Sequence, residues 1–339
     1  MREIENQRKN GPSGANAANR RTRWPRFAWL LPIGVILGLT ALPFAMGRPA
    51  GGVADGKPIT TFSEQGITPG RLQKPRAMAV DGDNNVYIVD MTARIQVFDR
   101  KGRFLRSWQT PESKNGRPTG LSIDRDGNLM VADTHYYRVL TYTPKGELLA
   151  EKTLGGTLGH APGEFGLVTD VVQDSKGNYY VAEYGEYDRI QKFSADHEFQ
   201  FQWGGHGEEI GQFIRPQNLA IDKNDHIWVA DACNHRIQVF DATGDEAKLV
   251  RTWGVEGNEP GQLKYPYDLT LDGKGHVYIC EFGNHRIQKF TLDGELVGLW
   301  GNVGRDPGQL HNPWAMVRNS RGRLYVLDTY NHRVQILKL

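Results

Sequence analysis

The residues of this chain that could do acid–base chemistry recur in one short phrase: an acid, a brief turn and an arginine. The six pairs are Asp90 and Arg94, Asp133 and Arg138, Glu183 and Arg189, Asp231 and Arg236, Glu281 and Arg286, and Asp328 and Arg333. Six carboxylates are enough for a ring of catalytic acids and bases. A residue needed once in every repeat, however, usually builds the repeat. We therefore expect each acid to accept backbone N–H bonds at its turn and each arginine to pair with it or with a neighbouring repeat.

Three of the six turns carry a histidine directly before the arginine, and histidine is a potential metal ligand. A zinc ion needs its ligands to converge within ~2.1 Å of one point. These histidines come once per repeat and should therefore be spread apart in space. We expect turn residues rather than zinc ligands at His235, His285 and His332.

The spacing of the arginines indicates which elements must position these side chains. Successive arginines lie 44, 51, 47, 50 and 47 residues apart, a period typical of a propeller or a solenoid. Each copy divides into short apolar or alternating segments separated by turns, which predicts four strands. In the fourth copy these strands are 218–221, 226–230, 236–240 and 248–253. Four-stranded antiparallel units repeated at this length are propeller blades.

The sixth copy supplies three strands, and a segment near the N-terminus is expected to supply the fourth. Residues 59–62 precede the first copy but are followed by the linker phrase that follows the outer strands elsewhere. Pairing 59–62 with 334–338 would close the ring and remove an exposed sheet edge. The sequence therefore predicts an all-β, six-bladed β-propeller of four-stranded antiparallel blades over residues 58–339, with the ring closed by an N-terminal strand.

The N-terminal part of the chain differs from the repeats in charge and hydropathy. Residues 1–26 carry seven basic and two acidic side chains, so the net charge of +2 leaves −3 on the rest of the chain. Residues 27–46 carry no charge and are long enough to span a hydrocarbon core of ~30 Å as a helix. We expect one transmembrane helix there, followed by a flexible linker at 47–57.

The basic tail sets the expected orientation in a membrane. Lysine and arginine stay on the cytoplasmic side, so residues 1–26 are predicted to be cytoplasmic and the propeller extracytoplasmic, in a periplasm. The alternative is a signal peptide cleaved near Met46, which would give a secreted propeller. The balance of −3 outside the tail argues against nucleic acid as a partner.

The turns of the last three copies resemble those of the NHL repeat family, and the resemblance covers residues 58–339. Members of that family include extracytoplasmic sensor domains of bacterial receptor kinases, RNA- and protein-binding domains of animal ubiquitin ligases, and a zinc-dependent amidating lyase. Function varies on this fold and has to be argued from the site. The pairs that carry the resemblance are Asn234–His235, Asn284–His285 and Asn331–His332.

In a propeller, the residue after each linker proline, at the start of the inner strand, is expected to point to the mouth of the central channel. In the amidating lyase, zinc-binding histidines occupy such positions. This chain has none there, so the resemblance does not carry the zinc ligands over. The corresponding residues are Arg76, Thr119, Thr169, Gln217, Tyr267 and Trp314.

The next residues inward include three with side-chain oxygens on consecutive blades, Asp170, Asn218 and Asp268. Together they could bind calcium or zinc in the central channel, with carbonyls or waters completing the six to eight oxygens that calcium prefers. The alternative is that they cap the ends of inner strands. No cofactor is firmly implied by either interpretation.

The turns of the second and third copies replace the Asn-His pair with tyrosines, which either form a recognition surface or pack between blades. Our leading hypothesis is a membrane-anchored binding scaffold or sensor for a protein, peptide or glycan. The alternative is a metal-dependent lyase or hydrolase of the peptidyl amidoglycolate lyase type, with its site in the central channel. The predicted ligand-binding residues are Arg76, Tyr136, Tyr137, Tyr184, Tyr187, Gln217, Tyr267 and Trp314.

Overall fold

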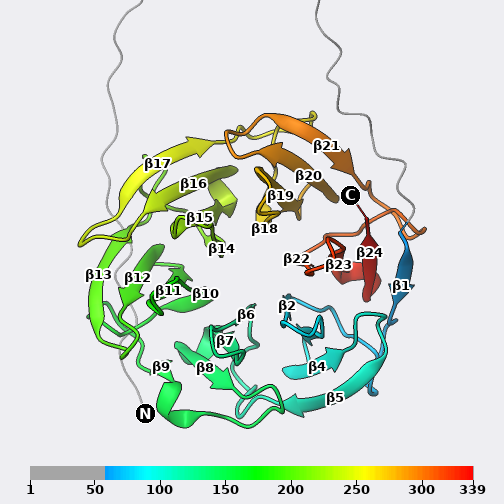
Figure 1. The fold of residues 1–339 in the computed structure, drawn as a ribbon, viewed down its shortest axis with the longest axis horizontal. Helices are drawn as coiled ribbons and strands as arrows, with labels where there is room; N and C mark the ends of the chain where they lie inside the picture. Colours follow the sequence, from blue (N-terminus) through cyan, green and yellow to red (C-terminus); the bar gives the residue numbers. More distant parts are fainter. Residues whose placement is uncertain (1–57, 339) are drawn as a thin grey trace, which may run out of the picture. The chain divides into compact units, whose positions relative to one another are not determined.

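The computed structural model describes residues 58–338, which form six four-stranded antiparallel sheets around a central axis (Figure 1). This confirms the predicted six-bladed propeller. The predicted tail, transmembrane helix and linker, residues 1–57, lie outside the described residues. Within residues 58–338, no helix is both long and apolar enough to cross a membrane.

In blades 1 to 5 the chain runs from the innermost strand to the outermost. Blade 1 contains β2 (Ala77–Val80), β3 (Val86–Val89), β4 (Arg94–Phe98) and β5 (Phe104–Gln109). Blade 2 contains β6 (Gly120–Ile123), β7 (Leu129–Asp133), β8 (Arg138–Tyr142) and β9 (Leu154–Gly155). Blade 3 contains β10 (Leu167–Gln173), β11 (Tyr179–Tyr184), β12 (Arg189–Phe193) and β13 (Phe199–Gly204).

The remaining blades repeat this order, with one exception at the end of the chain. Blade 4 contains β14 (Pro216–Ile221), β15 (His226–Asp231), β16 (Arg236–Asp241) and β17 (Lys248–Trp253). Blade 5 contains β18 (Pro266–Leu271), β19 (His276–Glu281), β20 (Arg286–Thr291) and β21 (Leu296–Trp300). Blade 6 contains β22 (Met316–Arg318), β23 (Leu324–Asp328), β24 (Arg333–Leu337) and, as its outer strand, β1 (Thr60–Phe62).

Strand β1 closes the ring as predicted. It pairs antiparallel with β24, and Thr60 lies opposite Ile336 while Phe62 lies opposite Val334. The Phe62 ring also packs on Phe98 of blade 1, with ring centroids 5.2 Å apart. The N-terminal strand therefore completes blade 6 and contacts blade 1.

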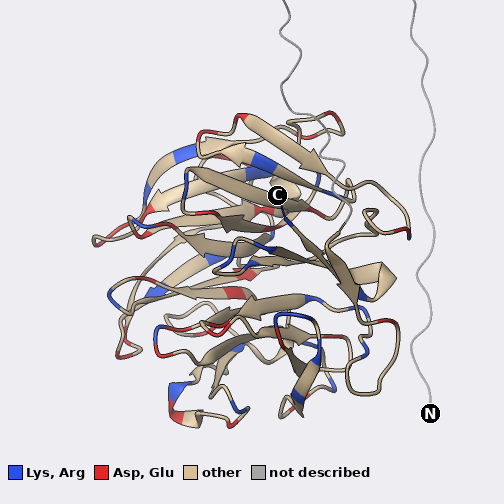
Figure 2. Ribbon diagram, turned by 45° about the vertical axis from the view of Figure 1, so that its right-hand side comes forward, with Lys and Arg blue, Asp and Glu red and all other residues tan. Residues whose placement is uncertain are grey.

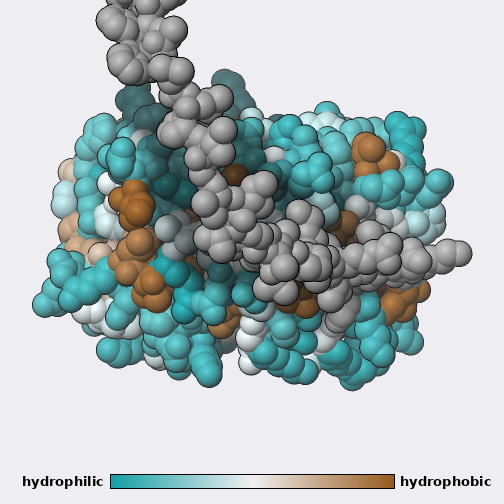
Figure 3. Space-filling view, turned by 90° about the horizontal axis from the view of Figure 1, so that it is seen from above, coloured by the Kyte–Doolittle hydropathy of each residue, from teal (hydrophilic) through white to brown (hydrophobic). Residues whose placement is uncertain are grey.

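The hydrophobic core lies between the blades. One of its clusters joins Trp228 and Ala230 of blade 4 to Leu269 and Ile279 of blade 5, and the other clusters join other neighbouring blades in the same way. Charged residues of both signs are spread over strands and loops (Figure 2). On the visible part of one side of the molecule, hydrophobic residues form small separate patches (Figure 3). Because this packing involves mainly the strands, the sequences of the loops at the two ends of the channel can differ from blade to blade.

The turn between the second and third strands holds the repeated phrase, and in three blades it is a single 3₁₀ turn. The residue after it is left-handed, as at His235 with φ of +54°. Short 3₁₀ segments of this kind serve as connectors between regular elements. The described 3₁₀ helices are η1 (Thr134–Tyr136), η2 (Ala150–Lys152), η3 (Ala232–Asn234) and η4 (Thr329–Asn331).

Candidate functional site

The six acid–arginine pairs are structural, as expected. All six acids are fully buried, and each arginine nitrogen lies 2.6 to 3.3 Å from its acid. In blade 4, Asp231 accepts the backbone N–H of Ile214, and Arg236 donates to three linker carbonyls. The pair therefore ties the linker to its blade. The charges of such a buried, hydrogen-bonded ion pair are already matched to each other, which is the arrangement expected of a structural pair.

The repeated histidines join neighbouring blades. Each ring accepts a hydrogen bond at Nδ1 from a backbone N–H in the next linker, so the ring is neutral at that nitrogen. Burial lowers the pKa of all three histidines. In blade 3, Asp188 takes over this role and accepts the N–H of Arg215 at 2.8 Å. The three bonds, each 3.0 Å long, run from Tyr265 to His235, from Asn312 to His285, and from Lys74 to His332.

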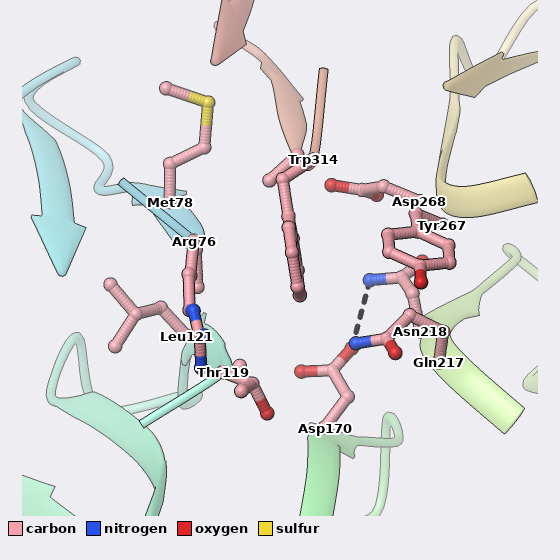
Figure 4. A pocket seen from close by; sticks show the side chains of 13 residues that line it. Arg76, Met78, Thr119, Leu121, Asp170, Gln217, Asn218, Tyr267, Asp268 and Trp314 are labelled. Atoms are coloured by element: carbon pink, nitrogen blue, oxygen red, sulfur yellow. Dashed lines mark hydrogen bonds between the residues drawn. The ribbon is translucent and has the colours of Figure 1, made fainter. Parts of the chain in front are cut away.

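The three inner polar residues line one small cavity of about 20 Å³ in the central channel, which has room for about one water molecule (Figure 4). Each side chain accepts a backbone N–H from the first strand of the next blade. The bonds run from Leu219 to Asp170, from Leu269 to Asn218, and from Met316 to Asp268, at 2.9, 3.0 and 2.7 Å.

These bonds bear on the predicted metal site. Asn218 turns its Nδ2 donor toward Asp170 at 2.9 Å, and its oxygen is already in use. Burial raises the pKa of Asp170 to about 7 and that of Asp268 well above its usual range, which favours the neutral acids. The side chains as they stand do not fit a calcium or zinc ion, which would have to displace the bonds between blades. Metal binding at Asp170, Asn218 and Asp268 stays a prediction.

We also looked for a metal site elsewhere among the histidines, cysteines and acids of the described residues. Among residues 58–338, no three of these side chains converge as a metal-binding group. The channel therefore offers a metal only the donors already described.

Five of the predicted ligand-binding residues meet around the mouth. Arg76, Gln217, Tyr267 and Trp314 line the cavity and its entrance, and Trp314 stands between Arg76 and Tyr267 (Figure 4). Tyr184 joins them through its electrostatic interaction with Arg76. We call this group the mouth site.

The other three predicted tyrosines lie elsewhere and are engaged in packing. The Tyr136 hydroxyl accepts the N–H of Asn115, and Tyr137 packs against the core between blades 2 and 3. Tyr187 lies against His160, with ring centroids 4.2 Å apart. The contact of Tyr137 fits the alternative that the sequence left open, in which tyrosines pack between blades. Ligand binding at these three tyrosines stays a prediction.

Aromatic rings form one wall of the mouth site. The Tyr267 ring stacks on Phe282 at 4.5 Å and meets Trp314 edge-on at 5.0 Å. Phe282 also contacts Tyr330 at 6.3 Å. Offset and edge-on pairs at these distances are favourable, so the rings hold one another in place.

Two further arginines belong to the site, and sequence analysis missed both. Arg215 lies between the rings of Tyr184 and Tyr267, 5.0 and 5.2 Å from their centroids, and Arg76 lies 5.2 Å from Trp314. Arg117 is close enough to act electrostatically on Arg76. The sequence feature that could have identified them is the residue before each linker proline, because Arg117 precedes Pro118 and Arg215 precedes Pro216.

The guanidinium groups of the three mouth arginines, Arg76, Arg117 and Arg215, have no acidic partner among residues 58–338. None lies within 4.0 Å of a carboxylate oxygen, and the side chains of Arg117 and Arg215 donate to neutral oxygens. Burial, and then repulsion by Arg215 and Arg117, lower the pKa of Arg76. Beside them, the Nδ1 of His135 and the Nε1 of Trp314 are buried without a hydrogen-bond partner. The mouth site therefore holds crowded positive charge that the protein does not neutralise.

Comparison with known sequences identifies the repeats. The family model described as "NHL repeat" matches residues 213–240, 263–290 and 310–337. The chain is 37% identical over 131 residues to "Peptidylglycine alpha-amidating monooxygenase" of Rattus norvegicus, which covers 36% of this chain and 13% of that protein. It is 26% identical over 187 residues to "NHL repeat-containing protein 3" of Homo sapiens, covering 48% of this chain and 51% of that protein. The chain thus spans between about an eighth and a half of these relatives' lengths.

Solved structures agree with the fold. A structure described as "Streptogramin B lyase structure" superposes with a TM-score of 0.59 at 14% identity and covers 82% of this chain and 97% of that one. At this identity the likeness concerns the fold alone. From these matches we conclude that the chain contains NHL repeats, three of them matched in blades 4 to 6 of a six-bladed β-propeller fold.

Proposed function

We propose that the propeller is a ligand-binding module, that its mouth site is the binding site, and that the ligand presents an anionic group there. The observation that carries this proposal is that, in the part of the chain that the structure describes, the guanidinium groups of Arg76, Arg117 and Arg215 have no acidic partner. Like charges held together and partly desolvated cost free energy, which an anion would offset. Guanidinium groups are also well suited to hold carboxylate or phosphate with two hydrogen bonds.

The aromatic rings support the same proposal. Tyr184, Tyr267 and Trp314 present large surfaces with few torsions to freeze, which is why tyrosine, tryptophan and arginine are enriched at binding hot spots. Cation–π contacts also fix the guanidinium groups of Arg76 and Arg215 before a ligand arrives. A protein, peptide or glycan carrying an acidic group fits this chemistry.

We further propose that residues 27–46 hold the module at a membrane, with the propeller on the extracytoplasmic side. The support is the uncharged run of twenty residues after a basic tail. The net charge of −3 outside the tail supports a partner other than nucleic acid.

The test uses two small probes on the full-length chain, phenyl phosphate and the uncharged benzyl alcohol, with binding measured by isothermal titration calorimetry. We expect saturable 1:1 binding of phenyl phosphate and at least about tenfold weaker binding of benzyl alcohol. Arg76→Met and Arg215→Met should each weaken phenyl phosphate binding, whereas Arg321→Met, at an exposed arginine in the turn after β22, should not. Equal affinity of the wild type for both probes, or loss of binding in Arg321→Met, would contradict the proposal.

A second candidate is a metal-dependent lyase or hydrolase of the peptidyl amidoglycolate lyase type, favoured by the 37% identity over 131 residues. The test is elemental analysis of the purified full-length chain. Stoichiometric zinc or calcium that is lost in Asp268→Asn would favour this candidate. Absence of both metals would reject its metal-based form.

A further inference from the structure

A second cavity lies between blades 4 and 5, at the end of the channel opposite the mouth. Its volume is about 500 Å³, within the range typical of small-molecule sites. The cavity is bounded by the turns that join the first two strands of each blade, residues 222–226 and 272–276. Nothing in the proposed function uses it.

At two other junctions the corresponding turns are joined by hydrogen bonds from a serine, which we call a latch, and the junction between blades 4 and 5 has no latch among the described residues. Between blades 3 and 4, Ser175 donates its N–H and its hydroxyl to the Asp225 carboxylate. Between blades 6 and 1, Ser320 donates in the same way to Asn84, at 3.1 and 2.8 Å. Two of the six junctions are thus joined by a serine and an acceptor three residues into the next turn.

Between blades 4 and 5 both latch positions differ. Lys223 takes the place of the serine, and Gly275 takes the place of the acceptor. A Cβ added at Gly275 would meet nothing within 4 Å. Within residues 58–338, no hydrogen bond joins these two turns, so the space between them stays free.

The walls of the cavity are apolar. Ile221, Leu271 and Leu292 line it while their other sides pack against the cores of blades 3 to 5. All three are half-buried, so each leaves aliphatic surface exposed to the cavity. An alkyl chain placed there would remove that surface from water, which is favourable.

The rim of the cavity carries two lysines beside the carboxylate of Asp222. Lys223 and Lys274 are exposed, and neither has a carboxylate oxygen within 4.0 Å among the described residues. The neighbouring acids are used by their own turns: Asp222 accepts bonds from His226 and Trp228, and Asp272 from His276. Among the described residues, the two lysines therefore line the cavity without an ion pair, and the Asp222 carboxylate beside them is held by its own turn.

We propose that this cavity binds a single-chain aliphatic carboxylate, with the alkyl chain on the apolar wall and the carboxylate at Lys223 and Lys274. This site is independent of the mouth site and of the proposed function. It combines what such a ligand requires: an apolar slot of sufficient size with cationic groups at one edge.

Decanoate, decanol and acetate, each titrated into the full-length chain below any micelle concentration, test the proposal. Decanoate should bind 1:1, decanol at least tenfold more weakly, and acetate not measurably. Lys223→Ser combined with Gly275→Asn rebuilds the latch seen at Ser320 and Asn84 and should weaken decanoate at least tenfold. Asparagine suits the position, since Asn84 adopts a positive φ of 65°.

A second variant guards against misfolding of the first. Lys223→Gln with Lys274→Gln changes only exposed side chains and should weaken decanoate about tenfold while leaving decanol unchanged. Lys176→Gln, in the equivalent turn of blade 3, is the matched control and should bind like wild type. No decanoate binding, or unchanged binding in both variants, would overturn the proposal. So would loss of decanoate binding in Arg76→Met with Arg215→Met, because it would place the ligand at the mouth.

Discussion

Two sets of arginines in this propeller differ in one respect, the presence of an acid. In the turns, every repeated arginine lies against a fully buried carboxylate, as Arg286 does against Glu281 at 2.6 Å. At the mouth, Arg76, Arg117 and Arg215 lie among aromatic rings and neutral oxygens. The contrast indicates that charge repeated in every blade is paired internally and builds the ring, whereas charge that occurs in only some blades and lacks an acidic partner among the described residues is available to a ligand.

Breaking a turn pair should have the largest effect. Arg286→Met leaves Glu281 buried and unpaired, so we expect the free energy of unfolding to fall by about 3–5 kcal/mol. Urea unfolding measures the change. Adding Glu281→Gln should recover part of the loss, because it removes the stranded charge. A loss below about 1 kcal/mol would mean that the repeated pairs do not hold the blades together.

The mouth arginines should respond in the opposite way. Arg76→Met is expected to leave the unfolding free energy within about 0.5 kcal/mol of wild type, because no carboxylate is stranded. Phenyl phosphate at 100 times its Kd should stabilise the wild type by about 2.7 kcal/mol. In the variant this ligand effect should shrink, as measured by urea unfolding with and without the probe. If Arg76→Met destabilised the protein as much as Arg286→Met, the mouth arginines would have to be regarded as structural, like the turn arginines.

The histidine links between blades should weaken in acid. The Nδ1 of His235 accepts the Tyr265 N–H, and burial lowers its pKa below the ordinary 6.5. Folded protein then binds fewer protons than unfolded protein, so this contribution is complete above pH 6.5 and declines as the pH falls below it. Relative to His235→Asn, the wild type should be more stable by about 1 kcal/mol at pH 8. Urea unfolding across pH should find this difference closing below pH 6.5; a difference that grows would contradict the assigned bond.

The smallest effect is expected for an ion pair at the surface. Arg103 pairs with Asp99 at 2.6 Å, but its side chain is 77% exposed. Arg103→Met should therefore change the unfolding free energy by less than about 0.5 kcal/mol. A change comparable to that of Arg286→Met would show that pairing alone, without burial of the acid, accounts for the stability of the turns.

The fold was predictable because the same sequence pattern occurs in all six blades. The period of the arginines indicated the blades, and the linker phrase after 59–62 indicated the closing strand β1. The predicted strands of blade 4 agree with β14 to β17, except that β14 begins two residues earlier and β15 and β16 each end one residue later. A short apolar segment alone can be a strand or part of a helix, but its recurrence at the same place in every repeat favours the strand.

The site was predictable only in part. The position after the linker proline led to Arg76, Gln217, Tyr267 and Trp314, but the position before it, which supplies Arg215, was not considered. Tyrosine type alone did not distinguish Tyr184 from Tyr187, since each lies near an arginine and only the fold decides which one faces the mouth. The cavity between blades 4 and 5 depends on the register of turns fifty residues apart, which no local pattern reveals.

The most direct test of the account is to locate an anion in the mouth. Crystals of the full-length chain soaked with 4-bromophenyl phosphate would give an anomalous bromine signal that marks the bound ring. We predict the phosphate against Arg76 and Arg215, with the ring against Tyr267 or Trp314. An ordered probe found elsewhere on the propeller, with the three mouth arginines unoccupied at saturating concentration, would contradict the claim that these arginines bind the ligand.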